Sequence, residues 1–294
     1  DTEASRGLGD VYKRQPLIFI VLWSSAFITT KPIVDHSEPF SALAFRFFFV
    51  SLGFLIFSIY KNFSLKVSKS NLIQSLVSGV LFHGIYLGGV FYSVSVGMPT
   101  GIAALIVTLQ PILTNILAGP ILKEHVSYHQ WIGILLGFLG AVLVLGFDIG
   151  KNIPFDGVIA TIISLVSITS ATIWQKKISN NLPLETSNTY QALGGCLFHI
   201  LIIVFFTKFQ INFSFTFIAA MSHQVLLVSF GAFTILMFLI RENSASKTTS
   251  FFFLIPSVSA LMAWLFLNEN LYFIDIIGFL IASIGVYIAT RPEK

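Results

Sequence analysis

Residues 16–60 read PLIFIVLWSSAFITTKPIV (16–34), DHSEP (35–39) and FSALAFRFFFVSLGFLIFSIY (40–60), and this stretch decides the fold. Two apolar runs flank a short polar connection. A helix needs about 20 mostly apolar residues to cross the hydrocarbon core of a bilayer. Each run has that length, so the stretch predicts two consecutive transmembrane helices.

The same pattern continues to the end of the chain. Further apolar runs, separated by short connections that hold most of the charges, are 72–92, 100–119, 128–147, 156–175, 187–206, 222–240, 248–267 and 271–290. The longer connection 207–221 is rich in aromatic residues, and we expect it to be an interfacial loop. The predicted fold class is an all-α membrane protein with ten transmembrane helices.

The composition excludes a soluble globular domain. Apolar residues make up 55% of the chain and charged residues only 10%, and the mean hydropathy is +0.86. A soluble protein carries roughly 25% charged residues because its surface must be solvated. The single cysteine, Cys196, rules out an internal disulfide. The sequence holds no metal-ligand cluster, and we expect neither a metal nor another cofactor.

Residues 1–15 do not match the rest of the chain. They are polar and charged, and the stretch from Gly7 to Gln15 resembles translated adaptor sequence at the edge of an assembled reading frame. We therefore expect 1–15 to be a non-native leader and leave it out of the fold.

Basic residues predict the orientation, because cytoplasmic loops are enriched in lysine and arginine. With the N-terminus inside, the inner side holds Lys61, Lys66, Lys69, Lys123, Lys176, Lys177, Arg241, Lys247, Arg291 and Lys294. The outer side holds Lys31, Lys151 and Lys208. We expect both termini in the cytoplasm. The distribution reflects membrane topology and does not indicate a nucleic-acid-binding patch.

An internal repeat divides the chain into two halves. A shift of 145 residues places Pro111 on Pro256, Glu124 on Glu269, Gly133 on Gly278, Gly140 on Gly285 and Lys31 on Lys176. Each half, 16–147 and 151–290, holds five expected spans. Because five is odd, the halves must have opposite orientations in the membrane. Inverted repeats of this kind are typical of secondary transporters, whose substrate site lies between the halves near the midplane.

Several short motifs carry a family resemblance. They are Trp23-Ser24-Ser25-Ala26-Phe27 with Lys31, Ala44-Phe45-Arg46-Phe47, Leu109-Gln110-Pro111-Ile112-Leu113 with Lys123-Glu124, Ile255-Pro256-Ser257-Val258, and Asn268-Glu269. Together with the repeat, they resemble the EamA-type family of the drug/metabolite transporter superfamily. The resemblance implies a multi-pass protein of the bacterial inner membrane that exports or takes up amino acids or other small metabolites. We expect it to be a monomer or weak dimer among membrane lipids.

The third expected helix holds the first candidate binding residues. Ser75, Gly79, His83 and Tyr86 follow helical spacing and share one face, and Gly84 lies on the other side with Gly88, as a packing pair. Ionisable groups at membrane depth usually face a cavity or the bundle interior. We expect His83 and Tyr86 to contact substrate; the alternative is an interior histidine bonded to a neighbouring helix. Proton coupling is an expectation that rests on His83.

Other candidate substrate contacts lie on three more helices. Trp23 and Phe27 share a face with Thr30, Ser164 and Ser167 follow helical spacing, and Gln110 is an uncharged polar residue at depth. Aromatic rings beside a few polar groups suit an amphipathic metabolite. The alternative for the hydroxyls is a bond to their own backbone.

Pro111 and Pro256 are candidate hinges. Each interrupts an apolar span at equivalent positions, and proline displaces the carbonyl four residues earlier, here of Val107 and Phe252. The freed carbonyls need another partner or a polar cavity. The alternative is a static kink that serves packing.

Charged and small residues give further expectations. Arg46 lies within the second span, where we expect it to snorkel to the outer headgroups; an anion-binding role is the alternative. We expect Glu124 and Glu269 to be stabilised by the N-termini of the helices that follow them. The glycine faces Gly133–Gly137–Gly140 and Gly278–Ala282–Gly285 predict close helix packing.

We expect a transporter and no enzyme. Cys196 and His199 could be combined in a membrane-embedded enzyme, but no third orienting residue and no nucleophile loop accompany them. No glycine-rich phosphate loop is present, so ATP is not the expected energy source. The predicted function is secondary transport of a small molecule by alternating access. A lipid flippase of the same superfamily is the other alternative.

Overall fold

The computed structural model describes residues 2–98, 100–145, 153–267 and 272–291, and these residues are helical with no strand among them. Eight helices within them are long and apolar enough to cross a membrane. A ninth apolar helix, Tyr128–Val144, is slightly shorter. Glu269 and Lys151 lie outside the described residues.

The helices of the first half are α1 Thr2–Val34, α2 Pro39–Tyr60, α3 Lys69–Gly79, η1 Val80–Tyr86, α4 Leu87–Ser95, α5 Thr100–Val107, α6 Gln110–Leu122 and α7 Tyr128–Leu145. Those of the second half are α8 Phe155–Ile178, α9 Leu184–Phe206, α10 Phe215–His223, η2 Gln224–Ala232, α11 Phe233–Glu242, α12 Ala245–Ser250, η3 Phe251–Leu254, α13 Ile255–Leu267 and α14 Phe273–Thr290.

Two long helices contain a wider π-helical segment. In the helix Lys69–Ser95 this segment is η1, and in the helix Phe215–Glu242 it is η2. Shifting η1 by the repeat offset places it on η2 to within one residue. Each half therefore has a widened turn at the middle of its third helix. Such widened turns occur frequently at functional sites.

The connection before η2 is shorter than the sequence suggests. The expected interfacial loop 207–221 is wrong for residues 215–221, because α10 already begins at Phe215. The Ser214 hydroxyl accepts a hydrogen bond from the Phe217 N–H and so caps this helix. The preceding segment forms a single antiparallel bridge, Ser37 with Ile211.

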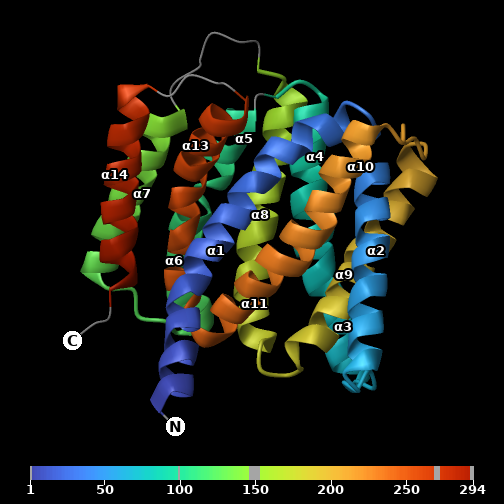
Figure 1. The fold of residues 1–294 in the computed structure, drawn as a ribbon, viewed down its shortest axis with the longest axis horizontal. Helices are drawn as coiled ribbons and strands as arrows, with labels where there is room; N and C mark the ends of the chain where they lie inside the picture. Colours follow the sequence, from blue (N-terminus) through green and yellow to red (C-terminus); the bar gives the residue numbers. More distant parts are fainter. Residues whose placement is uncertain (1, 99, 146–152, 268–271, 292–294) are drawn as a thin grey trace.

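Helix α1 begins and helix α14 ends at the same end of the bundle, here called the N-terminal end (Figure 1). The α2–α3 and α8–α9 connections also lie there, and helix α1 crosses the centre of the bundle (Figure 1). Helices α7 and α14 pack side by side at one flank, while α2, α3 and α9 form the other. The long helices thus run alternately up and down.

The α7–α14 contact is a close backbone approach. A side chain on Gly133 would meet the Ala289 backbone N at 2.5 Å, and one on Gly285 would meet the Gly137 backbone N at 2.3 Å. Gly140 and Gly278 are equally close to the facing backbone. The glycine faces predicted from the sequence are therefore confirmed as packing faces, which bring helices together where lipid gives no hydrophobic driving force.

The outer surface is apolar, as expected of a lipid-facing protein. Large apolar side chains are exposed along the outward faces of α2, α8 and α9, for example Ile162 at 48% and Leu201 at 55%. The buried interior instead holds many serine, threonine, asparagine and glutamine side chains. The polar side chains are thus gathered inside the bundle and the apolar ones on its surface.

Candidate substrate-binding site

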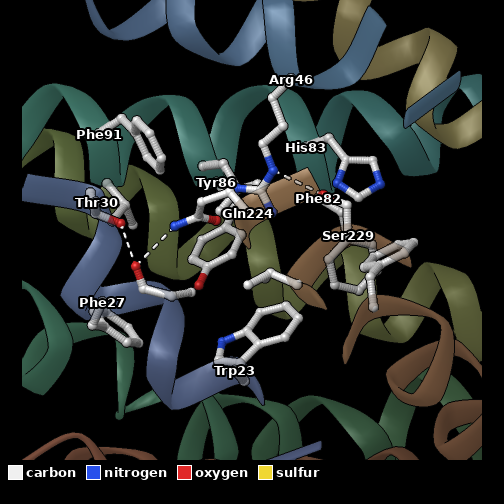
Figure 2. A pocket seen from close by; sticks show the side chains of 15 residues that line it. Trp23, Phe27, Thr30, Arg46, Phe82, His83, Tyr86, Phe91, Gln224 and Ser229 are labelled. Atoms are coloured by element: carbon white, nitrogen blue, oxygen red, sulfur yellow. Dashed lines mark hydrogen bonds between the residues drawn. The ribbon is translucent and has the colours of Figure 1, made fainter. Parts of the chain in front are cut away.

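A pocket lies between α1, α2, η1 and α4 of the first half and η2 and α11 of the second (Figure 2). Its polar lining residues are Thr30, Arg46, His83, Tyr86, Gln224 and Ser229. Its apolar lining residues are Trp23, Ala26, Phe27, Phe82, Leu87, Val90, Phe91, Val228 and Phe233. An apolar wall with a few placed polar groups is the common pattern of a small-molecule site.

Helix α1 supplies one wall. Trp23, Phe27 and Thr30, which the sequence places on one face, all line the pocket. The Thr30 hydroxyl donates to the Ala26 carbonyl at 2.9 Å. The Gln224 side-chain amide donates to the same carbonyl at 2.9 Å and thereby joins η2 to α1 (Figure 2).

Arg46 also lines the pocket, and the expectation that it snorkels to the headgroups is wrong. The side chain is only 3% exposed. Its Nε donates to the Ser229 hydroxyl at 2.9 Å, across to η2 (Figure 2). Its guanidinium lies 5.2 Å from the centre of the Phe47 ring. Arg46 is on the inward face of α2, and a position near the end of a span does not reveal which way a side chain points.

His83 and Tyr86 both lie in η1 and both line the pocket. The His83 ring is 4.3 Å from the Phe47 ring and 4.3 Å from the Phe233 ring, measured between centroids. The other two residues expected on this face are elsewhere. A side chain on Gly79 would strike the α9 backbone at Gln191. The wider turns of η1 change the angular spacing, so the four residues do not share one face.

The expected packing face of this helix does contact neighbours. A side chain on Gly84 would meet the Phe198 ring of α9 at 2.8 Å, and one on Gly88 would meet Phe40 at 3.2 Å. The assignment of these two glycines to helix packing is confirmed.

Ser164 and Ser167 do not line the pocket. Their hydroxyls donate to the Tyr86 carbonyl and to the Leu81 carbonyl, each at 2.9 Å. Both acceptors belong to η1, where the widened turns leave backbone carbonyls to be satisfied by other partners. The two serines therefore tie η1 to α8.

Gln110 lies outside the pocket as well. It is fully buried, and its amide donates to the Thr172 hydroxyl of α8 at 3.0 Å. The side-chain oxygen accepts no hydrogen bond from the described residues.

The helix is interrupted at both prolines. Pro111 stands at the start of α6, after a turn at Thr108 and Leu109 that separates it from α5. Pro256 stands at the start of α13, after the tight 3-10 turn η3. The Phe252 carbonyl, which the proline cannot serve, accepts a hydrogen bond from the Ile255 N–H.

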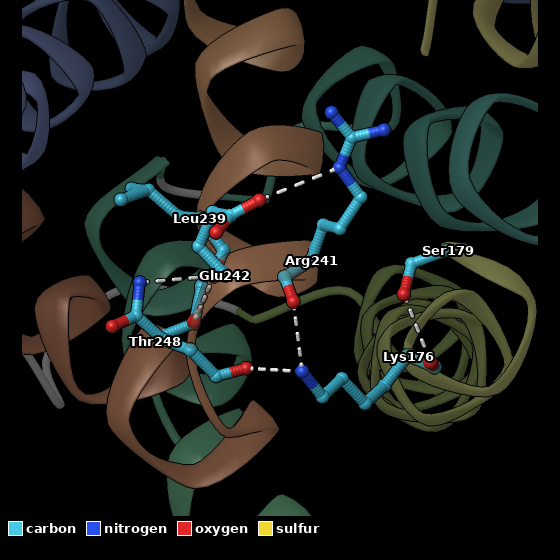
Figure 3. A network of polar contacts seen from close by, with 7 residues as sticks. Lys176, Ser179, Leu239, Arg241, Glu242 and Thr248 are labelled. Atoms are coloured by element: carbon cyan, nitrogen blue, oxygen red, sulfur yellow. Dashed lines mark hydrogen bonds and ion pairs between the residues drawn. The ribbon is translucent and has the colours of Figure 1, made fainter. Parts of the chain in front are cut away.

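At the N-terminal end, charged side chains hold the turn between α11 and α12. Lys176 donates to the Arg241 carbonyl at 3.0 Å and to the Asn243 carbonyl at 2.6 Å (Figure 3). Glu124 accepts from the Ala245 N–H at 3.0 Å and from the Ser246 N–H at 3.4 Å. A cation at a helix C-terminus and an anion at a helix N-terminus both complement the helix dipole.

The expectation for Glu124 is thus wrong about the partner. The carboxylate caps α12, a helix of the other half of the chain, and does not cap α7, which follows it. The physical reason is unchanged, because an anion is stabilised at a helix N-terminus. Sequence proximity suggested the wrong helix.

Cys196 and His199 serve packing. The Cys196 thiol contacts the Ala44 carbonyl at 3.7 Å, and His199 Nε2 lies 2.9 Å from the His83 carbonyl. Two polar pocket residues were not predicted from the sequence, Gln224 and Ser229. Their signal was the placement of an amide and a hydroxyl deep in an apolar span.

The model of the EamA-like transporter family matches residues 16–146 and again residues 156–291. The chain belongs to this family. The matches cover most of the chain, so the resemblance seen in the short motifs is confirmed. As an EamA-family protein, the chain is a multi-pass membrane transporter and not an enzyme.

Two relatives of this EamA protein carry transporter names. The uncharacterized transporter YvbV of Bacillus subtilis is 24% identical over 280 residues, covering 94% of this chain and 90% of the relative. A probable amino-acid metabolite efflux pump of Salmonella typhimurium is 22% identical over 282 residues, covering 92% of each. One solved crystal structure has a TM-score of 0.79 at 17% identity, covering 94% of this chain and 95% of that one, which shows a shared fold.

Proposed function

We propose that this EamA protein is a secondary transporter that moves a small amphipathic metabolite, such as an amino acid, through the pocket by alternating access. The observation that carries the proposal is the position of the pocket. Helices of both halves line it, at the midpoint of the long helices that contain η1 and η2. Transporters built from repeats bind substrate at that place.

We infer that the pocket is closed toward the N-terminal end of the bundle. Phe19, Trp23 and Phe252 form a ring cluster there, with centroids 5.3–5.7 Å apart. Ile20, Leu236 and Ile240 are buried in the same cluster. Aromatic packing of this kind excludes water. The lining residues run from Trp23 to Thr30 along α1, away from the closed end.

The equivalent lysines of the two halves make different contacts, and this asymmetry supports transport by alternating access. Lys176 joins the last turn of α8 to the α11–α12 turn. The repeat equivalent, Lys31, lies in the last turn of α1 and pairs instead with Asp35, which directly follows that helix. In the alternate state we propose that Lys31 caps the α4 end, as Lys176 now caps α11. One end would then close as the other opens.

The remaining topology is also part of the proposal. The eight long spans, the shorter helix Tyr128–Val144 and the interrupted segment α12–η3–α13 would make ten crossings. The halves 16–147 and 151–290 would be inverted repeats. The basic loops would face the cytoplasm of a bacterium, with both termini inside.

A pocket-filling variant tests the transport path. Ala26 lines the pocket, and Ala26→Trp should block transport by occupying it. Leu201→Trp, on the lipid-facing surface of α9, is the matched control. Both are reconstituted in liposomes with wild type and tested for counterflow of a panel of amino acids and other small metabolites.

We expect wild type and Leu201→Trp to move the same solute and Ala26→Trp to move little of it. Equal transport by Ala26→Trp would place the path elsewhere. Movement of a fluorescent lipid between leaflets, with no solute transported, would favour the flippase alternative. Loss of transport with both tryptophan variants would indicate a folding defect, which melting temperature detects.

A further inference from the structure

Arg46 is a buried cation without a carboxylate partner among the described residues. The ion pairs that they form are Lys31 with Asp35 and Arg241 with Glu242, both outside the pocket. The pocket lining includes no aspartate or glutamate. Burying a charge is energetically unfavourable unless the charge is compensated. The neutral Ser229 hydroxyl and the Phe47 ring compensate it only in part.

The two terminal nitrogens of the Arg46 guanidinium form an edge of defined geometry. Nε is occupied by Ser229, and within the described residues the terminal nitrogens Nη1 and Nη2 donate no hydrogen bond. A guanidinium presents its donors in a planar fork that matches the two oxygens of a carboxylate. The Nη1–Nη2 edge of this pocket-lining residue therefore has the geometry to bind a carboxylate.

The surroundings of Arg46 add two constraints on a ligand. Trp23, Phe27 and Tyr86 supply aromatic walls, so the ligand has an apolar body. Gln224 is 1% exposed, and its side-chain oxygen has no hydrogen-bond partner among the described residues. The amide orientation is fixed because its nitrogen donates to the Ala26 carbonyl. The Gln224 oxygen is a neutral acceptor, so it can accept a hydrogen bond from an N–H or O–H group of the ligand.

We infer that the substrate is an organic carboxylate with an apolar body, whose carboxylate binds the Nη1–Nη2 edge of Arg46. This inference rests on the proposed function and narrows its substrate class. The carboxylate compensates the buried cation. An ammonium group meets only the Gln224 oxygen and the aromatic rings, so an amine without a carboxylate does not bind well.

Four probes with the same body separate the contributions. 3-Phenylpropionate carries the carboxylate, L-phenylalanine carries carboxylate and ammonium, phenethylamine carries the ammonium, and 3-phenylpropionamide carries neither charge. Binding of each to the purified protein in detergent is measured by equilibrium dialysis. We expect wild type to bind the two carboxylates at least about tenfold more tightly than the amine and the amide, a difference of about 1.4 kcal/mol.

Arg46→Gln should abolish this preference by weakening the binding of the two carboxylates. Arg46→Lys, which keeps the charge and loses the fork, should retain part of it. Arg291→Gln removes an arginine at the exposed end of α14 and is the control. The wild-type comparison needs no variant, so it decides the matter even if Arg46→Gln does not fold.

Two results would overturn the inference. One is equal binding of carboxylate and amide by wild type. The other is an Arg46→Gln protein that keeps the carboxylate preference and only melts at a lower temperature, which would make Arg46 a packing residue. Neither result bears on the transport path, which the Ala26→Trp variant tests separately.

Discussion

At the residue scale, His83 has two properties that can be tested independently: the aromatic contacts of its ring and the hydrogen-bonding capacity of its ring nitrogens. Its ring lies between Phe47 and Phe233, and its own backbone carbonyl is bonded by His199. A phenylalanine at this position keeps the aromatic contacts and removes the ring nitrogens. The two properties of the histidine are therefore separable by one substitution.

We predict that His83→Phe lowers transport about fivefold at low substrate concentration. The variant loses the hydrogen bond that we expect the imidazole to make with the substrate, and one neutral hydrogen bond contributes about 1 kcal/mol. The melting temperature should change little. Transport in liposomes and thermal unfolding in detergent are measured together, with the exposed His129→Phe as control. Wild-type transport by His83→Phe would make His83 a packing residue.

The two serines of α8 are expected to act on stability. Removing both hydroxyls leaves the Leu81 and Tyr86 carbonyls without those partners. The double variant Ser164→Ala, Ser167→Ala should lose about 1–3 kcal/mol of unfolding free energy. Its solute selectivity should be unchanged. The control is Ser170→Ala, whose hydroxyl is exposed and bonds its own helix. A changed selectivity at normal stability would argue for direct substrate contact.

At the scale of the helices, the sequence pattern predicts where the transmembrane helices are, but it does not predict the backbone geometry within each helix. Apolar length is a local property, so the spans of α1, α2 and α9 could be read directly. The π-helical segments could not, because carbonyl partners on another helix, such as Ser164, support them. The same dependence on distant neighbours explains why Arg46 and Gln224 were misplaced or missed.

The interruptions at the prolines give an element-scale prediction. Alanine at Pro111 or Pro256 restores a backbone N–H and should straighten the helix across the break. We expect several-fold slower transport at an unchanged protein level. Pro120→Ala is the control, because Pro120 lies in the same helix as Pro111 but on its exposed side. If both variants transport like wild type, the breaks serve packing alone.

At the scale of the whole molecule, the central claim is that the pocket opens to each side of the membrane in turn. Lys176 bonds the α11–α12 turn at the N-terminal end, whereas its equivalent Lys31 pairs with Asp35 and makes no such contact with the α4 end among the described residues. If these lysines alternate in closing the two ends, removing each one should favour opening at the end that it closes. Lys176→Gln should favour opening at the N-terminal end, and Lys31→Gln opening at the other.

The most direct measurement is the reactivity of one thiol in the pocket, introduced by Ala26→Cys in a protein whose native thiol is removed by Cys196→Ser. A membrane-impermeant thiol reagent is added to right-side-out and to inside-out vesicles. We predict reaction from both sides, with Lys176→Gln increasing it from the N-terminal side and Lys31→Gln from the opposite side. Reaction from one side only, unaltered by either lysine substitution, would contradict alternating access through this pocket.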